Sequence, residues 1–435
     1  MTAAHRVMST NRLAVVAVVA VVAALLVGCS AGAPARHAAA PNRLTPVPAA
    51  PVTPPADPVL TPPEPDPLSF LTGGHASQLP FELVNNHIYI HAQVDGQPVR
   101  MIVDTADVSV LTPAAVVRLG LSRELRRTDD PEVATGPARG RELVVGGVRL
   151  AAPVFQVFAF ETFSDVEGSP FDGVVGLELF QRLAVRIDYP ASQLTLTRSE
   201  DFVPPAGAIV VPVELRDHAP VAAGSIDGIP ARFLIDTGAR TSVTVNSPFA
   251  RAHQLEARYH PAFEAIIAWG ANGASRAKPV RIGKVTLGDA VVTDVVGELY
   301  TGDRGEFASP DRSATLGGGV LKRFAVTFDD RDRKMYLEPG PALPRDIYDR
   351  AGMFFLRTGD KLRIVAVTPR GPAARAGLAA GDRIVAIDRA PAASRTVAAW
   401  RTVLSGGEVG ARHVLTVTND RGRRDRAIVL AELLP

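Results

Sequence analysis

The stretch RFLIDTGARTSV, residues 232–243, places a carboxylate directly after a run of apolar residues. Residues 233–235 are typical of a buried strand, and Asp236 follows them with no polar residue between. An ionised carboxylate costs free energy to bury unless it is paired or hydrogen-bonded. Its position at the end of such a strand therefore indicates a chemical role for Asp236.

A similar stretch occurs earlier in the chain. HIYIHAQVDGQPVRMIVDTADVSVL (87–111) and PVAAGSIDGIPARFLIDTGARTSVT (220–244) both predict two strands joined by an Asp-Gly turn, and both end in Asp, Thr and a small residue. Each copy is followed by an apolar pair that closes on glycine and then by a strand, in 171–196 and 313–337. The period is too long for a solenoid repeat, so each copy predicts a lobe, and the short strands predict that both lobes are mostly β.

The N-terminus has the pattern of an export signal. Basic residues precede the apolar run LAVVAVVAVVAALLVG, which ends in Leu-Val-Gly-Cys at residues 26–29. This ending resembles the bacterial lipobox, so we expect a lipoprotein signal peptide over 1–29 with lipidation at Cys29. An uncleaved anchor and an ordinary cleavage site are the alternatives. Because Cys29 is the only cysteine, we expect no intramolecular disulfide.

Composition divides the remaining chain into four parts. Residues 30–78 are rich in proline and alanine and predict a semi-rigid linker. The two lobes are expected over 79–203 and 204–342, and a third folded segment over 343–435. In that segment Val397, Trp400 and Leu404 share one face of a predicted helix.

Several classes of partner are disfavoured. The formal net charge of +2 and the 6% aromatic content give no nucleic-acid footprint. The nine histidines show no metal-ligand spacing, so we expect neither a metal nor a cofactor. Ser275 and Lys278 match a Ser-x-x-Lys pattern, but the partner motifs of penicillin-recognising enzymes are missing, which favours chance.

The paired Asp-Thr motif, with each copy followed by an apolar-apolar-Gly element, resembles the aspartic proteases. The sequence ARTS after DTG is most similar to bacterial retropepsin-like aspartyl proteases, and two motifs in one chain resemble the two-lobed pepsin-like arrangement. The resemblance implies a mostly β fold with two acid-protease-like β-barrel lobes that form a pseudo-dimer. The third segment resembles a circularly permuted α+β PDZ domain. Together the resemblances cover about residues 79–435.

The family chemistry explains the carboxylate at the strand end. Peptide hydrolysis without a metal needs a base to activate water and an acid to protonate the leaving group, and two adjacent carboxylates that share a proton can do both. The resemblance implies that Asp104 and Asp236 are this pair and that Thr105 and Thr237 brace their loops. Glycine after threonine, as at Gly238, lets the two backbones approach closely.

The first lobe departs from the family pattern in two ways. Ala106 stands where glycine is usual, and Ser109 lies five residues after its aspartate whereas Ser242 lies six after its own. A shorter turn could displace Asp104. Two alternatives therefore stay open: a second lobe that is active only as a homodimer, and a catalytically degenerate relative that binds peptides.

The resemblance also implies a hairpin flap over the substrate. The candidates are residues 134–147 and 268–280, the latter with Trp269 and Gly270, although Trp269 could equally pack at the base of a hairpin. Ala239 after DTG is similar to the retroviral enzymes and favours a mildly acidic or near-neutral optimum.

The PDZ-like segment predicts a second binding site. Gly352, Met353, Phe354 and Phe355 resemble the loop that receives a C-terminal carboxylate, and the adjoining strand could pair with a peptide. The predicted protein is thus an exported, lipid-anchored aspartic endopeptidase in the cell envelope. Its expected partners are a peptide or protein substrate, C-terminal peptide tails and the membrane.

Overall fold

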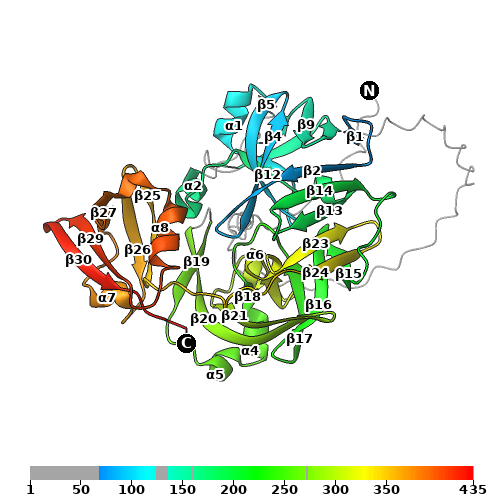
Figure 1. Cartoon of the computed structure of the whole chain (residues 1–435). Helices are drawn as coiled ribbons and strands as arrows, with labels where there is room; N and C mark the ends of the chain where they lie inside the picture. The colour runs from blue at the N-terminus through cyan, green and yellow to red at the C-terminus, as the bar shows by residue number, and fades with distance from the viewer. Residues whose placement is uncertain (1–67, 124–135, 159–160, 271–272, 435) are drawn as a thin grey trace, which may run out of the picture.

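Figure 1 shows the computed structural model, which describes residues 68–123, 136–158, 161–270 and 273–434. These residues form two β lobes and a separate C-terminal α+β domain (Figure 1). Among them, no helix combines the length and the apolar character needed to cross a membrane. The expected signal peptide, Cys29 and most of the expected linker lie outside the described residues.

The first lobe is a curved sheet with three short helices. Its strands are β1 (Leu68–Phe70), β3 (Glu82–Val84), β4 (His87–Val94), β5 (Gln97–Val103), β6 (Val110–Leu111), β7 (Ser122–Arg123), β8 (Ala138–Arg139), β9 (Glu142–Val145), β10 (Val148–Ala151), β11 (Val154–Val157) and β12 (Gly173–Val175). Its helices are α1 (Pro113–Leu119), α2 (Glu161–Glu167) and α3 (Leu177–Phe180). Strand β12 pairs in parallel with β5 and antiparallel with β6, so the chain between β5 and β6 forms a tight loop beside β12.

The second lobe repeats this arrangement. Its strands are β15 (Ile209–Arg216), β16 (Ala219–Ile226), β17 (Ile229–Ile235), β18 (Val243–Val245), β19 (Ala265–Gly270), β20 (Gly273–Leu287), β21 (Ala290–Tyr300) and β22 (Ala314–Leu316). Its helices are α4 (Ser247–Ala252), α5 (Leu255–Tyr259), the 3-10 helix η1 (Glu306–Ala308) and α6 (Gly318–Leu321). Strand β22 is parallel to β17 and antiparallel to β18, as β12 is to β5 and β6.

A continuous sheet joins the two lobes. It runs through β2 (Ala76–Pro80), β14 (Gln193–Arg198), β13 (Leu183–Asp188), β23 (Phe324–Asp329), β24 (Lys334–Pro339) and β15, so three strands from the first half of the chain continue directly into three from the second half. One hydrophobic core extends through both lobes. The pairing of β13 with β23 therefore fixes the orientation of the two lobes relative to each other.

The folded chain begins earlier than the sequence suggested. The linker was expected to run to residue 78, but β1 pairs with β10 and β2 pairs with β14. Leu68 and Phe70 are buried in the core of the first lobe, which explains why this short apolar segment folds despite the prolines before it.

The C-terminal domain has its own hydrophobic core. Its elements are β25 (Met353–Thr358), β26 (Lys361–Val367), α7 (Pro372–Arg375), β27 (Arg383–Ile387), β28 (Ala390–Pro391), η2 (Ala392–Ser394), α8 (Val397–Leu404), β29 (Arg412–Asn419) and β30 (Gly422–Val429). The sheet order β25-β26-β27-β29-β30 leaves β25 at an edge. The α8 residues Val397, Trp400 and Leu404 are all buried in this core rather than lining a groove, and Trp400 Nε1 donates to the Ala392 carbonyl at 2.8 Å.

Candidate active site

Asp104 and Asp236 occupy equivalent places at the ends of β5 and β17. The Asp104 N–H donates to the Val175 carbonyl and the Asp236 N–H donates to the Leu316 carbonyl, both at 3.0 Å. Each aspartate is therefore held by the last residue of the parallel neighbouring strand. Both side chains are fully buried.

Thr105 and Thr237 tie the two loops together across the lobe interface. Thr105 Oγ1 donates to the Ile235 carbonyl at 2.8 Å and accepts from the Thr237 N–H at 3.1 Å. Thr237 Oγ1 donates to the Val103 carbonyl at 2.9 Å and accepts from the Thr105 N–H at 3.1 Å. These four reciprocal hydrogen bonds place both aspartate loops around one pseudo-two-fold axis.

The two carboxylates are fixed from one side. Asp104 Oδ1 accepts from the Ala106 N–H at 2.7 Å, and Asp236 Oδ1 accepts from the N–H groups of Gly238 and Ala239 at 2.8 and 3.0 Å. The Oδ2 atoms of both aspartates are buried without a hydrogen-bond partner within the described part of the chain. A pair of such oxygens can share a proton and hold one water molecule.

Burial makes both carboxyls weaker acids than usual, and the charge of Asp104 adds to this effect at Asp236. Burial raises the pKa of the Asp104 carboxyl to about 6, although the hydrogen bond from Ala106 opposes this shift. Burial and then the negative charge of Asp104 raise the pKa of Asp236 well above its ordinary value. A protonated carboxyl beside an ionised one is therefore the favoured state over a range of pH.

The shorter first loop leaves Asp104 in place. The third residue after each aspartate makes the same contact, because the Leu177 N–H donates to the Asp107 carbonyl and the Gly318 N–H donates to the Ala239 carbonyl. The extra residue of the second loop lies beyond this contact, so the length difference does not reach the aspartates. The methyl group of Ala106 packs in a small apolar cluster with Ala219, Val221 and Leu234.

A buried ion cluster beside the loops was not predicted from the sequence. Glu167, at the end of α2, lies 3.4 Å from both Arg240 Nε and His87 Nε2 and accepts from Asn85 Nδ2 at 2.7 Å. Burial opposes the ionised form of Glu167, but Arg240 and His87 hold its pKa below the ordinary value. His87 lowers the pKa of Asp104 as well, so this cluster is electrostatically connected to the two aspartates.

Only one flap candidate forms a long described hairpin. Trp269 and Gly270 lie at the end of β19, which pairs with β20, although residues 271–272 lie outside the described chain. Arg240 Nη2 donates to the Ile267 carbonyl at 2.8 Å and so connects this hairpin to the second aspartate loop. The other candidate, 134–147, is described from residue 136 onward, and there β8 and β9 are paired within the sheet of the first lobe.

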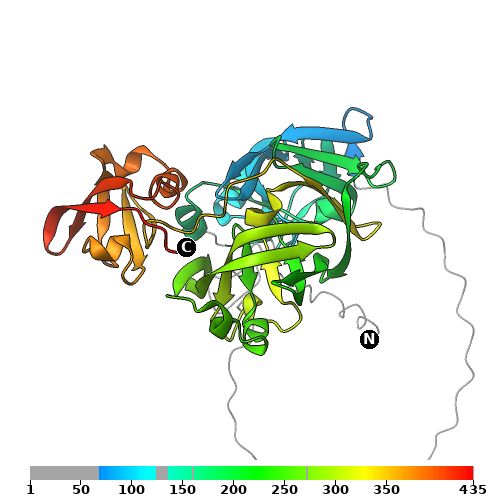
Figure 2. The same ribbon diagram turned by 60° about the horizontal axis from the view of Figure 1, so that its bottom comes forward.

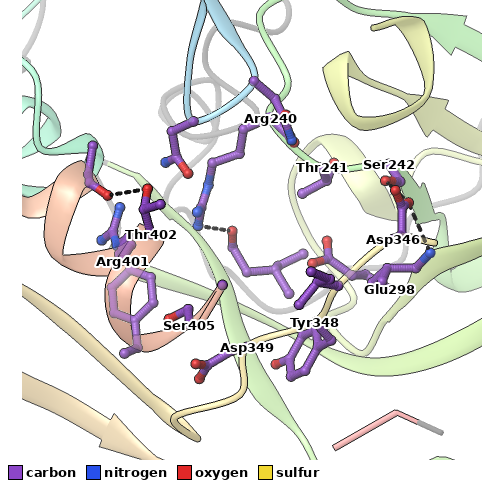
Figure 3. A pocket seen from close by; sticks show the side chains of 18 of the residues that line it. Arg240, Thr241, Ser242, Glu298, Asp346, Tyr348, Asp349, Arg401, Thr402 and Ser405 are labelled. Carbon is purple, nitrogen blue, oxygen red and sulfur yellow. Dashed lines mark hydrogen bonds between the residues drawn. The ribbon is translucent and has the colours of Figure 1, made fainter. Parts of the chain in front are cut away.

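A large cavity of about 1150 Å³ lies next to the second aspartate loop (Figure 3). Arg240, Thr241 and Ser242 line one side, and Arg401 of α8 and Ser405, the residue after α8, line another. Neither aspartate is among its lining residues. The cavity therefore lies between the second aspartate loop and the C-terminal domain.

Backbone N–H groups of the loop that precedes β25 already have a hydrogen-bond partner within the loop. The N–H groups of Ala351 and Met353 donate to the Asp349 carboxylate at 2.9 and 2.8 Å. Met353 and Phe355 are buried in the domain core, and Phe354 lines the cavity. Gly352 has a φ of 68°, a left-handed conformation that favours glycine and shapes this loop.

No described residues form a metal site. Among residues 68–434, outside the gaps named above, no group of three or more histidine, cysteine, aspartate or glutamate side chains is placed to hold a metal ion.

Sequence families match the lobes and the C-terminal domain separately. Residues 90–179 and 222–316 match the family described as aspartyl protease, and residues 363–419 match the PDZ domain. Each aspartyl protease match contains one Asp-Thr loop together with its apolar-apolar-Gly strand. No curated protein matches the chain.

A retropepsin-like aspartic protease from Rickettsia conorii, known from a crystal structure, is similar at 19% identity. The similarity covers 30% of this chain and 91% of that chain, with a TM-score of 0.23. The relation of the two lobes to the aspartyl proteases therefore depends on the family matches and on the repeated fold, not on that crystal structure. The chain contains two lobes that match the aspartyl protease family, followed by a C-terminal domain that matches the PDZ domain.

Proposed function

We propose that this protein is an aspartic endopeptidase that hydrolyses peptide bonds with Asp104 and Asp236 of one chain. The observation that carries the proposal is the reciprocal hydrogen bonding of Thr105 and Thr237, which brings the two aspartate loops together. Both carboxylates are buried, and each keeps one oxygen free of partners within the described chain.

The geometry supports hydrolysis at the pair by direct attack of a water molecule. The ionised carboxylate takes a proton from a water molecule, which attacks the scissile carbonyl carbon. The protonated carboxylic acid donates a hydrogen bond to the carbonyl oxygen and stabilises the tetrahedral intermediate. Transfer of a proton to the amine nitrogen then breaks the C–N bond. The backbone N–H groups of Ala106 and Gly238 hold the carboxylates in orientation during these steps.

The proposal includes export and a membrane tether. The basic and apolar N-terminus and the Leu-Val-Gly-Cys ending support a lipidated Cys29, and the proline-rich segment after it supports a spacer from the membrane. The PDZ domain would bind peptide tails and so recruit substrates or regulate cleavage.

A catalytically degenerate peptide-binding lipoprotein is the second candidate. Ala106 in place of glycine is the observation that favours it. A second lobe active only as a homodimer would need Asp236 and its copy to meet, and here Asp104 occupies the place of that copy.

The purified protein, incubated with a mixed peptide library, tests the proposal. We expect endoproteolytic cleavage that pepstatin inhibits and that Asp236→Asn abolishes. Cleavage that continues unchanged in Asp236→Asn would assign the activity to a contaminant or to another site. Absence of cleavage over the whole pH range would favour the peptide-binding alternative.

A further inference from the structure

The groove of the PDZ domain lies between its edge strand β25 and helix α8. Strand β25 pairs on one side with β26 and with no strand on the other, within the described chain. An exposed sheet edge beside a helix can accept an extended peptide as an additional strand. Any segment already seated there would compete with such a peptide.

Helix α2 of the first lobe is seated at this place. It contacts both β25 and α8, and Figures 1 and 2 show it between the first lobe and the PDZ domain. Gly168, directly after α2, approaches α8 so closely that a Cβ atom on it would lie 2.4 Å from Val397 Cβ and 2.6 Å from the Ala398 nitrogen. Only glycine fits this position, because a Cβ atom would clash with α8. The φ of +75° at Gly168 is a second reason, since it disfavours other residues.

The charges of α2 complement those of the groove. Asp165 interacts electrostatically with Arg357 at the end of β25. Glu167 interacts in the same way with Arg401 of α8, a side chain whose Nη2 donates to the Phe355 carbonyl of β25 at 3.0 Å. Two acidic residues of α2 thus interact electrostatically with two basic residues of the groove.

We propose that α2 is an internal occupant of the PDZ groove and that a peptide binding along β25 must displace it. The contact is made by residues of this chain alone, and it holds whether or not the protein cleaves peptides. The hydrogen bonds from the loop N–H groups to Asp349 add to the effect, because a peptide carboxylate would have to replace that side chain as well.

Displacement of α2 would reach the second aspartate loop through Glu167. This side chain pairs with Arg240, four residues after Asp236, and Arg240 in turn donates to the Ile267 carbonyl of β19. Removal of Glu167 from this cluster releases Arg240 and with it the connection between hairpin and loop. Peptide binding in the groove therefore changes the surroundings of the catalytic pair without touching it.

The test compares two Gly→Ala variants of the full protein, at positions that share a positive φ but differ in the atoms around them. Gly168→Ala places a methyl group against α8 and undocks α2. Gly207→Ala is the matched control, because Gly207 also has a positive φ, +78°, but nothing lies within 4 Å of its Cβ position. Asp165→Arg, at a partly exposed position, is a second undocking variant that places a positive charge beside Arg357 and serves if Gly168→Ala fails to fold.

Two measurements decide the proposal. Amide hydrogen exchange along β25 and α8 should be at least about tenfold faster in Gly168→Ala and Asp165→Arg than in the wild-type and Gly207→Ala proteins. The probe for binding is a peptide selected from a random library against the Gly168→Ala protein. It should bind the wild-type and Gly207→Ala proteins at least about tenfold more weakly, because their grooves are mostly occupied. Equal exchange in all proteins, equal affinities, or no selectable peptide would overturn the proposal.

Discussion

Gly238 of the second lobe lies directly against the carboxylate of Asp104 in the first lobe. A Cβ atom on Gly238 would stand 1.8 Å from Asp104 Oδ2 and 2.5 Å from its Cγ. The second motif therefore requires glycine at this position, because any side chain there would push Asp104 away from Asp236.

Gly238→Ala should lower kcat/KM by at least about a hundredfold, since a displacement of about 1 Å at a reacting group can cost that much. Rates on a fluorogenic peptide measure this. The control is Ala106→Gly, which completes the glycine pattern. It should keep the wild-type rate and lose about 0.5–1 kcal/mol of stability from backbone entropy and the lost methyl contacts. A fully active Gly238→Ala protein would contradict the close approach.

Removal of the hydroxyl of Thr237 should destabilise the lobe interface. Thr237→Val keeps the shape but leaves the Thr105 N–H and the Val103 carbonyl without their Oγ1 partner in a buried site. We expect a loss of about 2–4 kcal/mol in the free energy of unfolding, measured with denaturant. Thr237→Ser, which keeps the hydroxyl, should lose less than half as much, and equal losses in both variants would show that the hydroxyl is not responsible.

The pH dependence of cleavage should be bell-shaped with an acid limb near pH 6. When pH falls below the lower apparent pKa of the pair, both carboxyls are protonated and no base remains. Burial raises the pKa of Asp104 to about 6, so activity should be lost on acidification through this value. A profile of kcat/KM against pH measures both limbs. Full activity maintained at about pH 4 would show that the pair is less desolvated than the structure indicates.

The same shifts predict a stability gain when the pair is neutralised. A carboxyl whose pKa is raised on folding stabilises the protein at low pH, and this contribution is lost as pH rises through the folded pKa. At about pH 7 the Asp236→Asn protein should therefore be more stable than the wild type by about 1 kcal/mol, or about 2–4 °C in the unfolding temperature. The difference should shrink at about pH 4. A less stable Asp236→Asn protein at neutral pH would contradict the sign.

Local motifs made the fold and the aspartate loops predictable. Asp104 and Asp236 each follow an apolar strand within a repeated pattern, so their neighbours in sequence are also their structural supports. The length difference between the loops suggested that Asp104 could be displaced. The length difference does not displace Asp104, because the contacts of Asp107 and Ala239 fix both turns before the extra residue is reached.

Contacts between distant segments could not be predicted in this way. The cluster of His87, Glu167 and Arg240 joins residues far apart in sequence, and no spacing rule relates them. The same holds for α2 on the PDZ domain, since a seven-residue segment carries no signal of its partner. The strand at Leu68 was missed because the prolines before it dominate the local composition.

The most direct test of the central claim, that one chain supplies both carboxylates of one site, is the cleavage rate of Asp104→Asn. The measurement uses the best peptide from the library and protein concentrations that span a dimerisation range. We predict at least about a hundredfold loss of kcat/KM at every concentration, because the remaining acid lacks its partner. An Asp104→Asn protein that keeps the wild-type rate, or recovers it as its concentration rises, would contradict the single-chain pair.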